Sequence, residues 1–290
     1  MAMKHTDRIP SITSERRVLK RFRASFNEYV EHSKENRDPE GSSNKDGSSR
    51  FYGDTNCFDD MYQRCFDGYN AHKVADRKAD LAKEFYSERK ESELGVVGDD
   101  LDIARWVEGR PDCWWSDEPT PCKPLVHIIA DTCANADVGG VNFVNHGGAL
   151  ALLCELVQEV ADVRISTFNG AEMMNSKCDF ADSMELKGYD EPLDIPRIGA
   201  VTHPSFFRRI SFGIFEAFDA EAGYGYRKGW SKLMSEEDFY DWMNIEKGTN
   251  VVMFDSPSHH DFEDVNSTRK YVERMFDDIQ KMIIPDHAQA

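Results

Sequence analysis

The chain has 290 residues, 40% of them hydrophobic and 30% charged, which is enough for one sizeable core with appended segments. It has no uncharged apolar run of about 18 residues and no apolar N-terminal stretch, so the sequence disfavours a membrane span or secretion and predicts a soluble cytoplasmic protein. The seven cysteines are scattered without a CxxC pair, as expected of reduced thiols. The net charge of −18 disfavours nucleic-acid binding by the bulk of the surface.

The first 37 residues differ from the rest of the chain in charge. They hold nine Lys or Arg against five Asp or Glu, a net of +4, so residues 38–290 carry −22, which suits solubility or a basic partner. Apolar residues recur at three- and four-residue steps from Ser14 to His32, which predicts a basic helix in an N-terminal extension, residues 1–37. Such a helix suits nucleic acid or an acidic partner, although a solvated basic face is the commoner explanation.

Two segments without a clear strand pattern follow. Residues 38–50 (DPEGSSNKDGSSR) contain no apolar side chain and predict a flexible linker. Residues 51–124 predict a helical and irregular cover, with a short helix capped by Asn56 and a charged helix from about Ala71 to Lys90. The run GRPDCWWSDEPTPCKP in this segment is too rich in proline for a helix, and its two tryptophans either cover the core or anchor an interface.

The chain changes character in residues 125–284, where apolar runs alternate with amphipathic stretches. The run Leu125–Asp131 predicts a strand buried on both faces, 146–161 a helix, and 163–170 a second strand. Strand, helix and strand in this order predict a right-handed parallel unit, so the fold class is α/β with a mainly parallel sheet flanked by helices. The remaining expected elements are an antiparallel edge strand at 183–190, helices at 204–218, 235–243 and 264–282, a buried strand at 250–254, and a tail at 285–290.

Two acidic residues stand at the ends of the expected strands. Asp131 begins the loop Asp-Thr-Cys-Ala-Asn, and Asp255 begins the loop Asp-Ser-Pro-Ser. In open parallel sheets ligands bind beyond the carboxyl ends of the strands, so both loops are candidate binding loops.

This order of elements resembles the von Willebrand factor A (VWA) fold, whose metal-ion-dependent adhesion site has the motif Asp-x-Ser-x-Ser after its first strand. By position Asp131 matches the motif's aspartate, while Cys133 and Asn135 stand where the serines belong. Asp255 matches the acid after the fourth strand, and Thr202 is a loose match to the site's threonine. The resemblance implies an Mg²⁺ site, but Mg²⁺ prefers oxygen ligands and Cys133 offers sulfur, so the site is expected to be degenerate.

A wider resemblance covers about residues 50–282. The runs FYGDTNCFDDMYQRCFDGY, GRPDCWW and GGALALLCEL resemble VWA-like proteins of tailed bacteriophages. VWA proteins in such genomes often accompany AAA+ ATPases of the MoxR kind. The resemblance therefore implies a phage-encoded protein of the host cytoplasm, with such an ATPase or a host protein as its partner.

Three other patterns allow more than one interpretation. His259, His260 and Asp261 can gather a metal, or form a polar loop before a helix, because adjacent histidines diverge on a regular backbone. The glycine pairs at 139–140 and 147–148 can bind an anion at a helix N-terminus, or provide loop flexibility. Cys133 can act as a nucleophile if His127 or His203 lies beside it.

The leading prediction is a non-catalytic VWA-like module that binds a protein partner through the loops 131–146, 199–205 and 255–263. One alternative is an acidic decoy or inhibitor of a host nucleic-acid-binding or defence protein, and another is a metal-dependent hydrolase that uses Asp131 and Asp255. The residues expected at the partner interface are Cys133, His203, Ser256, Ser258, His259 and His260.

Overall fold

The computed structural model describes residues 18–45, 51–83, 100–101, 114–115, 123–173, 178–218, 225–227 and 229–283. Its centre is a sheet of six strands, with the order β1-β6-β5-β4-β8 and with β7 paired to β5. Three of the four neighbouring pairs along this path are parallel, and β5 with β6 is the antiparallel one. The expected α/β class with a mainly parallel sheet is therefore confirmed. The strands are β1 (Val18–Ser25), β4 (Leu125–Asp131), β5 (Asp162–Met173), β6 (Cys178–Lys187), β7 (Gly225–Arg227) and β8 (Asn250–Phe254), and a separate ribbon pairs β2 (Asp100–Leu101) with β3 (Trp114–Trp115).

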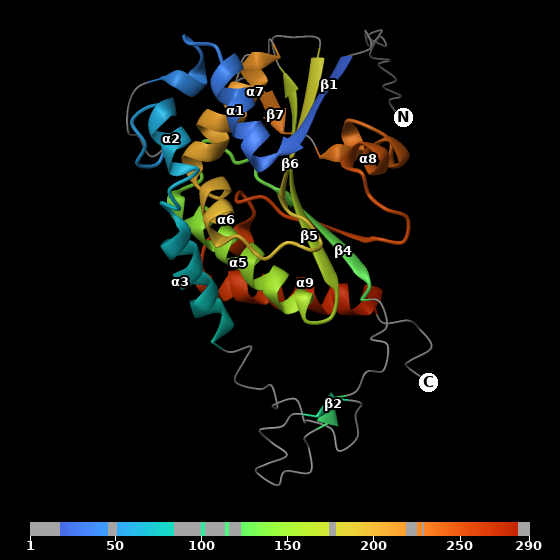
Figure 1. Ribbon diagram of the computed structural model, residues 1–290. Helices are drawn as coiled ribbons and strands as arrows, with labels where there is room; N and C mark the ends of the chain where they lie inside the picture. Colours follow the sequence, from blue (N-terminus) through green and yellow to red (C-terminus); the bar gives the residue numbers. More distant parts are fainter. Residues whose placement is uncertain are drawn as a thin grey trace, which may run out of the picture.

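The helices cover the two faces of the sheet unequally. Most of them lie on one face, whereas α8 lies on the other (Figure 1). Residues of β4 point alternately to the two faces of the sheet. Val126 and Ile128 belong to the large core, and Ile129 belongs to the small core beneath α8. The helices are α1 (Phe26–Asn36), α2 (Phe58–Arg64), α3 (Ala71–Ala82), α5 (Gly140–Gln158), α6 (Ile195–Val201), α7 (Phe212–Ala217), α8 (Glu236–Met243) and α9 (Val265–Ile283), with a π-helical turn at Phe206–Ser211 before α7.

The prediction of a single helix from Ser14 to His32 is wrong for Val18–Ser25, which form the edge strand β1. This strand runs parallel to β6, and α1 begins only after Ser25, whose side chain and Glu28 form a capping box. Tyr29 and Val30 of α1 are fully buried in the main core. Residues 18–36 are therefore part of the sheet and the core, and not of an appended extension.

Part of the expected linker is ordered. Ser43 is fully buried, and its backbone N–H donates to the Glu216 carboxylate at 2.9 Å. The fully buried Arg209 donates to the carbonyl oxygens of Ser43 and Lys45, at 3.2 and 2.9 Å. Residues 46–50 lie outside the described chain, as do 84–99, 102–113, 116–122 and the tail, so the expectations for those stretches stay predictions.

The glycines of α5 have a different role from the one expected. The helix begins at Gly140, six residues before the expected start at 146, and takes Gly147 and Gly148 into its interior. A Cβ atom on Gly147 would lie 2.3 Å from the Thr202 hydroxyl, and one on Gly148 would lie 2.6 Å from a carbon of Arg77. This pair therefore permits close packing against α6 and α3, and is not a flexible loop. The helix is long and apolar enough to span a bilayer, but 72% of that window is buried inside the protein.

The other predictions for the second half are met to different degrees. The strands β4 and β8 have the expected bounds, and α8 begins after the expected Ser235 cap, whose hydroxyl accepts the Asp238 N–H. β6 is the expected antiparallel partner of β5, but it is not an edge, because β1 covers it. The expected helix at 204–218 divides into the π-helical turn and α7, and α6 was not expected.

Candidate functional site

The two predicted aspartates lie at the ends of neighbouring parallel strands. Ala130 of β4 pairs with Phe254 of β8, and Asp131 and Asp255 are respectively the last residue of β4 and the residue after β8. Asp131 is 9% exposed, and its Oδ1 accepts the Cys133 N–H at 2.9 Å. Asp255 is exposed, and its main chain makes the contact: the Asp255 N–H donates to the Tyr271 hydroxyl at 2.9 Å.

The two loops after these aspartates are joined to each other and anchored from beneath. The Asn135 N–H donates to the Ser258 hydroxyl at 2.9 Å, while the buried Ser256 hydroxyl accepts the Ser258 N–H at 3.3 Å. The fully buried Arg208 guanidinium donates to the carbonyl oxygens of Asn135 and Val138 at 2.7 and 3.4 Å, and also to that of Phe51. Burial lowers the pKa of Arg208 to about 10, so the group stays charged at neutral pH.

A buried polar cluster lies beneath the loop that follows β4. The Thr132 hydroxyl donates to Asn169 Oδ1 at 2.6 Å, and Asn169 Nδ2 donates to Asp182 Oδ1 at 2.8 Å. The Tyr29 hydroxyl donates to the same carboxylate oxygen at 2.8 Å. Burial raises the pKa of Asp182 to about 7, against the effect of the bonds from Asn169 and Tyr29, and the charge of Asp131 raises it further. Sequence reasoning missed Asn169 and Asp182, because β5 and β6 carry several other polar residues and no local pattern singles out these two.

The residues expected to hold Mg²⁺ do not form the required oxygen shell. The Thr202 hydroxyl donates to the Ile198 carbonyl at 2.7 Å and lies in the contact between α6 and α5. The Cys133 thiol is buried and directed to Asn169 Oδ1 at 3.5 Å. Magnesium needs near-octahedral oxygen ligands, and of the four expected ligands Thr202 is engaged elsewhere, while Asp131, Asn135 and Asp255 lie in the strand-end loops. With a sulfur at Cys133 and the Thr202 hydroxyl turned to Ile198, the fit to Mg²⁺ is poor.

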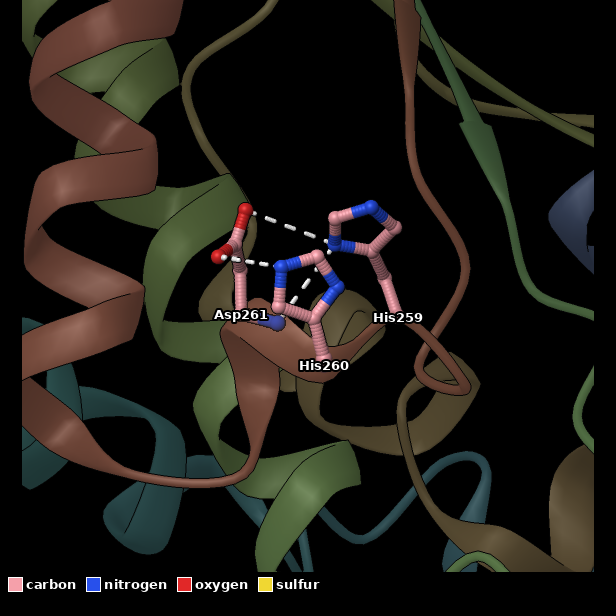
Figure 2. A group of neighbouring side chains, drawn as sticks. All are labelled: His259, His260 and Asp261. Carbon is pink, nitrogen blue, oxygen red and sulfur yellow. Dashed lines mark hydrogen bonds and ion pairs between the residues drawn. The ribbon is translucent and has the colours of Figure 1, made fainter.

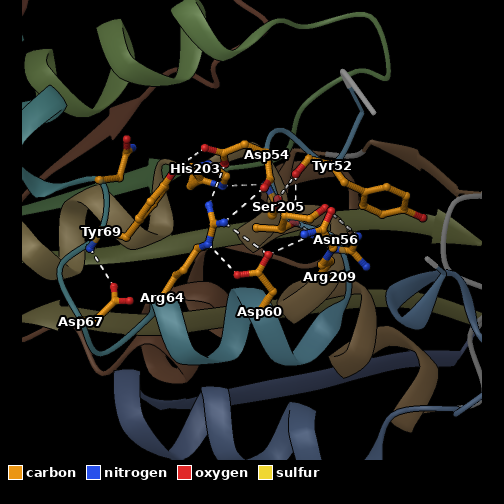
Figure 3. A network of polar contacts seen from close by, with 12 residues as sticks. Tyr52, Asp54, Asn56, Asp60, Arg64, Asp67, Tyr69, His203, Ser205 and Arg209 are labelled. Atoms are coloured by element: carbon orange, nitrogen blue, oxygen red, sulfur yellow. Dashed lines mark hydrogen bonds and ion pairs between the residues drawn. The ribbon is translucent and has the colours of Figure 1, made fainter. Parts of the chain in front are cut away.

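His203 lies in a second polar network, formed with residues 52–69 (Figure 3). It is 5% exposed, its Nε2 lies 3.0 Å from Asp54 Oδ1, and its Nδ1 accepts the Ser205 N–H at 3.2 Å. Arg64 forms an ion pair with Asp54 at 2.8 Å. Burial lowers the pKa of His203 to about 4, although the Asp54 carboxylate opposes this, so the ring is neutral at pH 7. Both ring nitrogens are engaged, so His203 links Asp54 to the loop at 203–205.

His127 is also engaged within the protein. It is fully buried, and its Nε2 lies 2.9 Å from the Ser166 hydroxyl. Burial lowers its pKa to about 3. The geometry therefore gives no support to a Cys133 nucleophile activated by either histidine, because each imidazole serves a structural partner.

A cavity of about 570 Å³ opens beside the network. It combines the start of α5 and the loop at 203–204 with the segment 51–80, which the sequence placed in a cover, and the expected contact loop 255–263 does not line it. The basic Lys73 and Arg77 on its wall stand near the acidic Asp54, Asp76 and Asp80. The other lining residues are Gly53, Asn70, Gly140, Val141, Val144, His203 and Pro204. The cavity thus provides polar walls of both charges at the carboxyl end of the sheet.

Comparison with known proteins gives one match. Neither the curated proteins nor the solved structures contain a match to this chain. A family described as a domain of unknown function (DUF7192) matches residues 5–282, a span that includes β1, the cover segment and the strand-end loops together. The chain therefore belongs to the DUF7192 family.

Proposed function

We propose that this protein is a VWA-like, non-catalytic module that binds a protein partner at the carboxyl end of its sheet. The observation that carries the proposal is the way the loops after β4 and β8 are built. Arg208 and Tyr271 fix their main chains from inside, whereas the side chains of Asn135 and Asp255 are exposed. A loop that is fixed before binding loses little conformational entropy when a partner docks.

The same construction gives little support to catalysis. Cys133 is 4% exposed, and His203 uses both ring nitrogens in contacts within the protein. The exposed side chains at this edge, among them Asn135 and Asp255, therefore offer a contact surface for a partner.

The cavity beside the loops adds a place for one polar side chain of the partner. Its volume of about 570 Å³ and its walls of both charges suit a charged or amide side chain better than a purely apolar one. The acidic body of the chain favours a basic partner surface. A MoxR-type AAA+ ATPase and a host protein are the partner classes that the VWA resemblance suggests, and a phage origin with action in the host cytoplasm belongs to the same proposal.

Site-specific photo-crosslinking tests the proposed surface. Val141 at the start of α5 and Met282 at the end of α9 are both exposed, at 59% and 52%, and form a matched pair. With a photoreactive amino acid at position 141, we expect a covalent adduct with a co-produced MoxR-type ATPase or with a host protein. Position 282 should give none.

The result that would overturn the proposal is an absence of adduct at position 141, or equal adducts at both positions. An adduct at position 141 that persists at high salt favours binding through the shape of the loops. One that disappears on adding salt favours the acidic decoy over a shaped interface, because exposed charges are screened.

A further inference from the structure

His259, His260 and Asp261 converge on one point, which a regular backbone would not allow (Figure 2). His259 has extended backbone angles, with φ −70° and ψ 139°, and a short 3₁₀ helix begins at the next residue. This change of conformation turns both rings toward the Asp261 carboxylate. His259 Nδ1 lies 3.4 Å from Asp261 Oδ2, and His260 Nε2 lies 3.4 Å from Asp261 Oδ1.

These separations match the spacing of metal ligands. A tetrahedral Zn²⁺ site with bonds of about 2.0–2.1 Å places neighbouring ligand atoms about 3.3 Å apart. Each imidazole nitrogen lies 3.4 Å from a different oxygen of the Asp261 carboxylate, close to that spacing. One ligand atom from each of the three residues lies within 4.8 Å of the other two. The His260 side chain is 76% exposed, so a modest rotation of this side chain can shorten the longest distance among the three ligand atoms.

The backbone beneath the cluster is fixed by contacts that do not involve the three side chains. The His259 N–H donates to the Ser256 carbonyl at 2.9 Å, and the Thr268 hydroxyl donates to the Asp261 carbonyl at 2.8 Å. The Asn145 amide donates to the Phe262 carbonyl at 2.8 Å, and the Phe262 side chain is fully buried. A fixed backbone reduces the ordering that metal binding would otherwise require.

The competing contacts are weak enough to give way. The Asp261 N–H points to His259 Nδ1 at 3.4 Å, which is longer than a usual hydrogen bond. Arg274 Nη2 lies 3.0 Å from Asp261 Oδ2, but the Arg274 side chain is 56% exposed and can move into solvent.

We infer that His259, His260 and Asp261 form a Zn²⁺ site with a fourth position open to water. Two imidazoles and one carboxylate suit a borderline metal such as Zn²⁺ better than Mg²⁺. The site is separate from the aspartates of the adhesion motif, and it stands whether or not the strand-end loops bind a protein.

Calorimetry of the full chain with ZnCl₂ tests the inference. We expect one Zn²⁺ per chain, with Kd raised about tenfold or more in His259→Ala and in Asp261→Asn. His72→Ala is the matched control, because His72 is an exposed histidine on α3, and it should bind as the wild type does. Circular dichroism confirms that each variant is folded. An unchanged Kd in both site variants would overturn the inference, as would a wild type that binds no Zn²⁺.

Two further measurements separate this site from adventitious binding. X-ray absorption should show only nitrogen and oxygen neighbours at about 2.0 Å, whereas sulfur at about 2.3 Å would place the metal on a cysteine and overturn the assignment. Arg274→Gln should bind Zn²⁺ at least as tightly as the wild type, because Arg274 competes with the metal for one carboxylate oxygen of Asp261. Weaker binding in this variant would contradict a metal held beside Asp261.

Discussion

The two strand-end aspartates occupy equivalent places in the sequence pattern but have different surroundings. Asp131 is nearly buried, caps its own loop and lies above the polar cluster of Asn169 and Asp182. Asp255 is exposed, and its loop is held through main-chain atoms by Tyr271 and His146. A shared position at the sheet edge therefore does not imply a shared role. The first loop begins with three buried residues, Asp131 to Cys133, whereas the second begins with an exposed aspartate.

Among the variants that test this comparison, Arg208→Met should have the largest effect on the free energy of unfolding. The guanidinium donates to three main-chain carbonyls, two of them in the first loop, and Met removes all three of these bonds. We expect the free energy of unfolding to fall by about 4 kcal/mol. Urea unfolding measures this loss, and hydrogen exchange should show weaker protection at residues 131–138.

The control is Arg197→Met, which removes a half-buried arginine whose partners are two carboxylates and one carbonyl. It should cost about 1 kcal/mol or less. Equal losses in the two variants would mean that Arg208 does not support the first loop in the way its contacts suggest.

The second prediction concerns pH. The pKa of Asp182 in the folded protein is about 7, above its ordinary value of 3.8, so the folded state keeps a proton that the unfolded state releases. The stability from this group is full below about pH 4 and is lost as the pH rises through 7. Between pH 5 and pH 8 the wild type should lose about 2–3 kcal/mol relative to Asp182→Asn, which cannot ionise.

Urea unfolding at the two pH values measures this difference. Asp190→Asn is the control, because Asp190 is exposed, and it should follow the wild-type profile. Parallel pH profiles for Asp182→Asn and the wild type would contradict a proton held at Asp182.

The smallest expected loss of stability comes from replacing the two aspartates themselves. Asp131→Ala removes the acceptor of the Cys133 N–H and should cost about 1.5 kcal/mol, while Asp255→Ala should cost less than about 0.5 kcal/mol. Asp131→Ala should also lower the pKa of Asp182, because the charge of Asp131 contributes to its rise. Thermal unfolding of the two variants side by side measures the contrast, and similar costs would remove the distinction between the loops.

The sequence predicted those features that depend on neighbouring residues. The bounds of β4 and β8 follow from compact apolar runs, and the adjacency of Asp131 and Asp255 follows from the geometry of a parallel sheet. The polar cluster and the role of Arg208 depend on residues far apart in the chain. The Asn135 carbonyl lies 73 residues before the arginine that binds it, and no local pattern predicts such a contact.

β1 illustrates the same limit. Its apolar residues fit a helical period as well as a strand, and only its pairing with β6, more than 150 residues later, decides between them. The histidine pair illustrates a local limit. Its two rings converge because the backbone changes from extended to 3₁₀-helical after His259, and sequence reasoning did not foresee this change.

The position of β1 also bears on how the protein avoids self-association. β1 pairs with β6 along eight residues, from Val18 with Cys178 to Ser25 with Glu185. A fragment that begins after residue 37 would leave this side of β6 with unpaired N–H and C=O groups, which is a template for adding strands from other molecules. β1 presents exposed Arg21 and Arg23 near that edge, and such charges hinder further pairing. β1 thus closes this side of β6 with a strand whose exposed arginines disfavour the addition of a further strand.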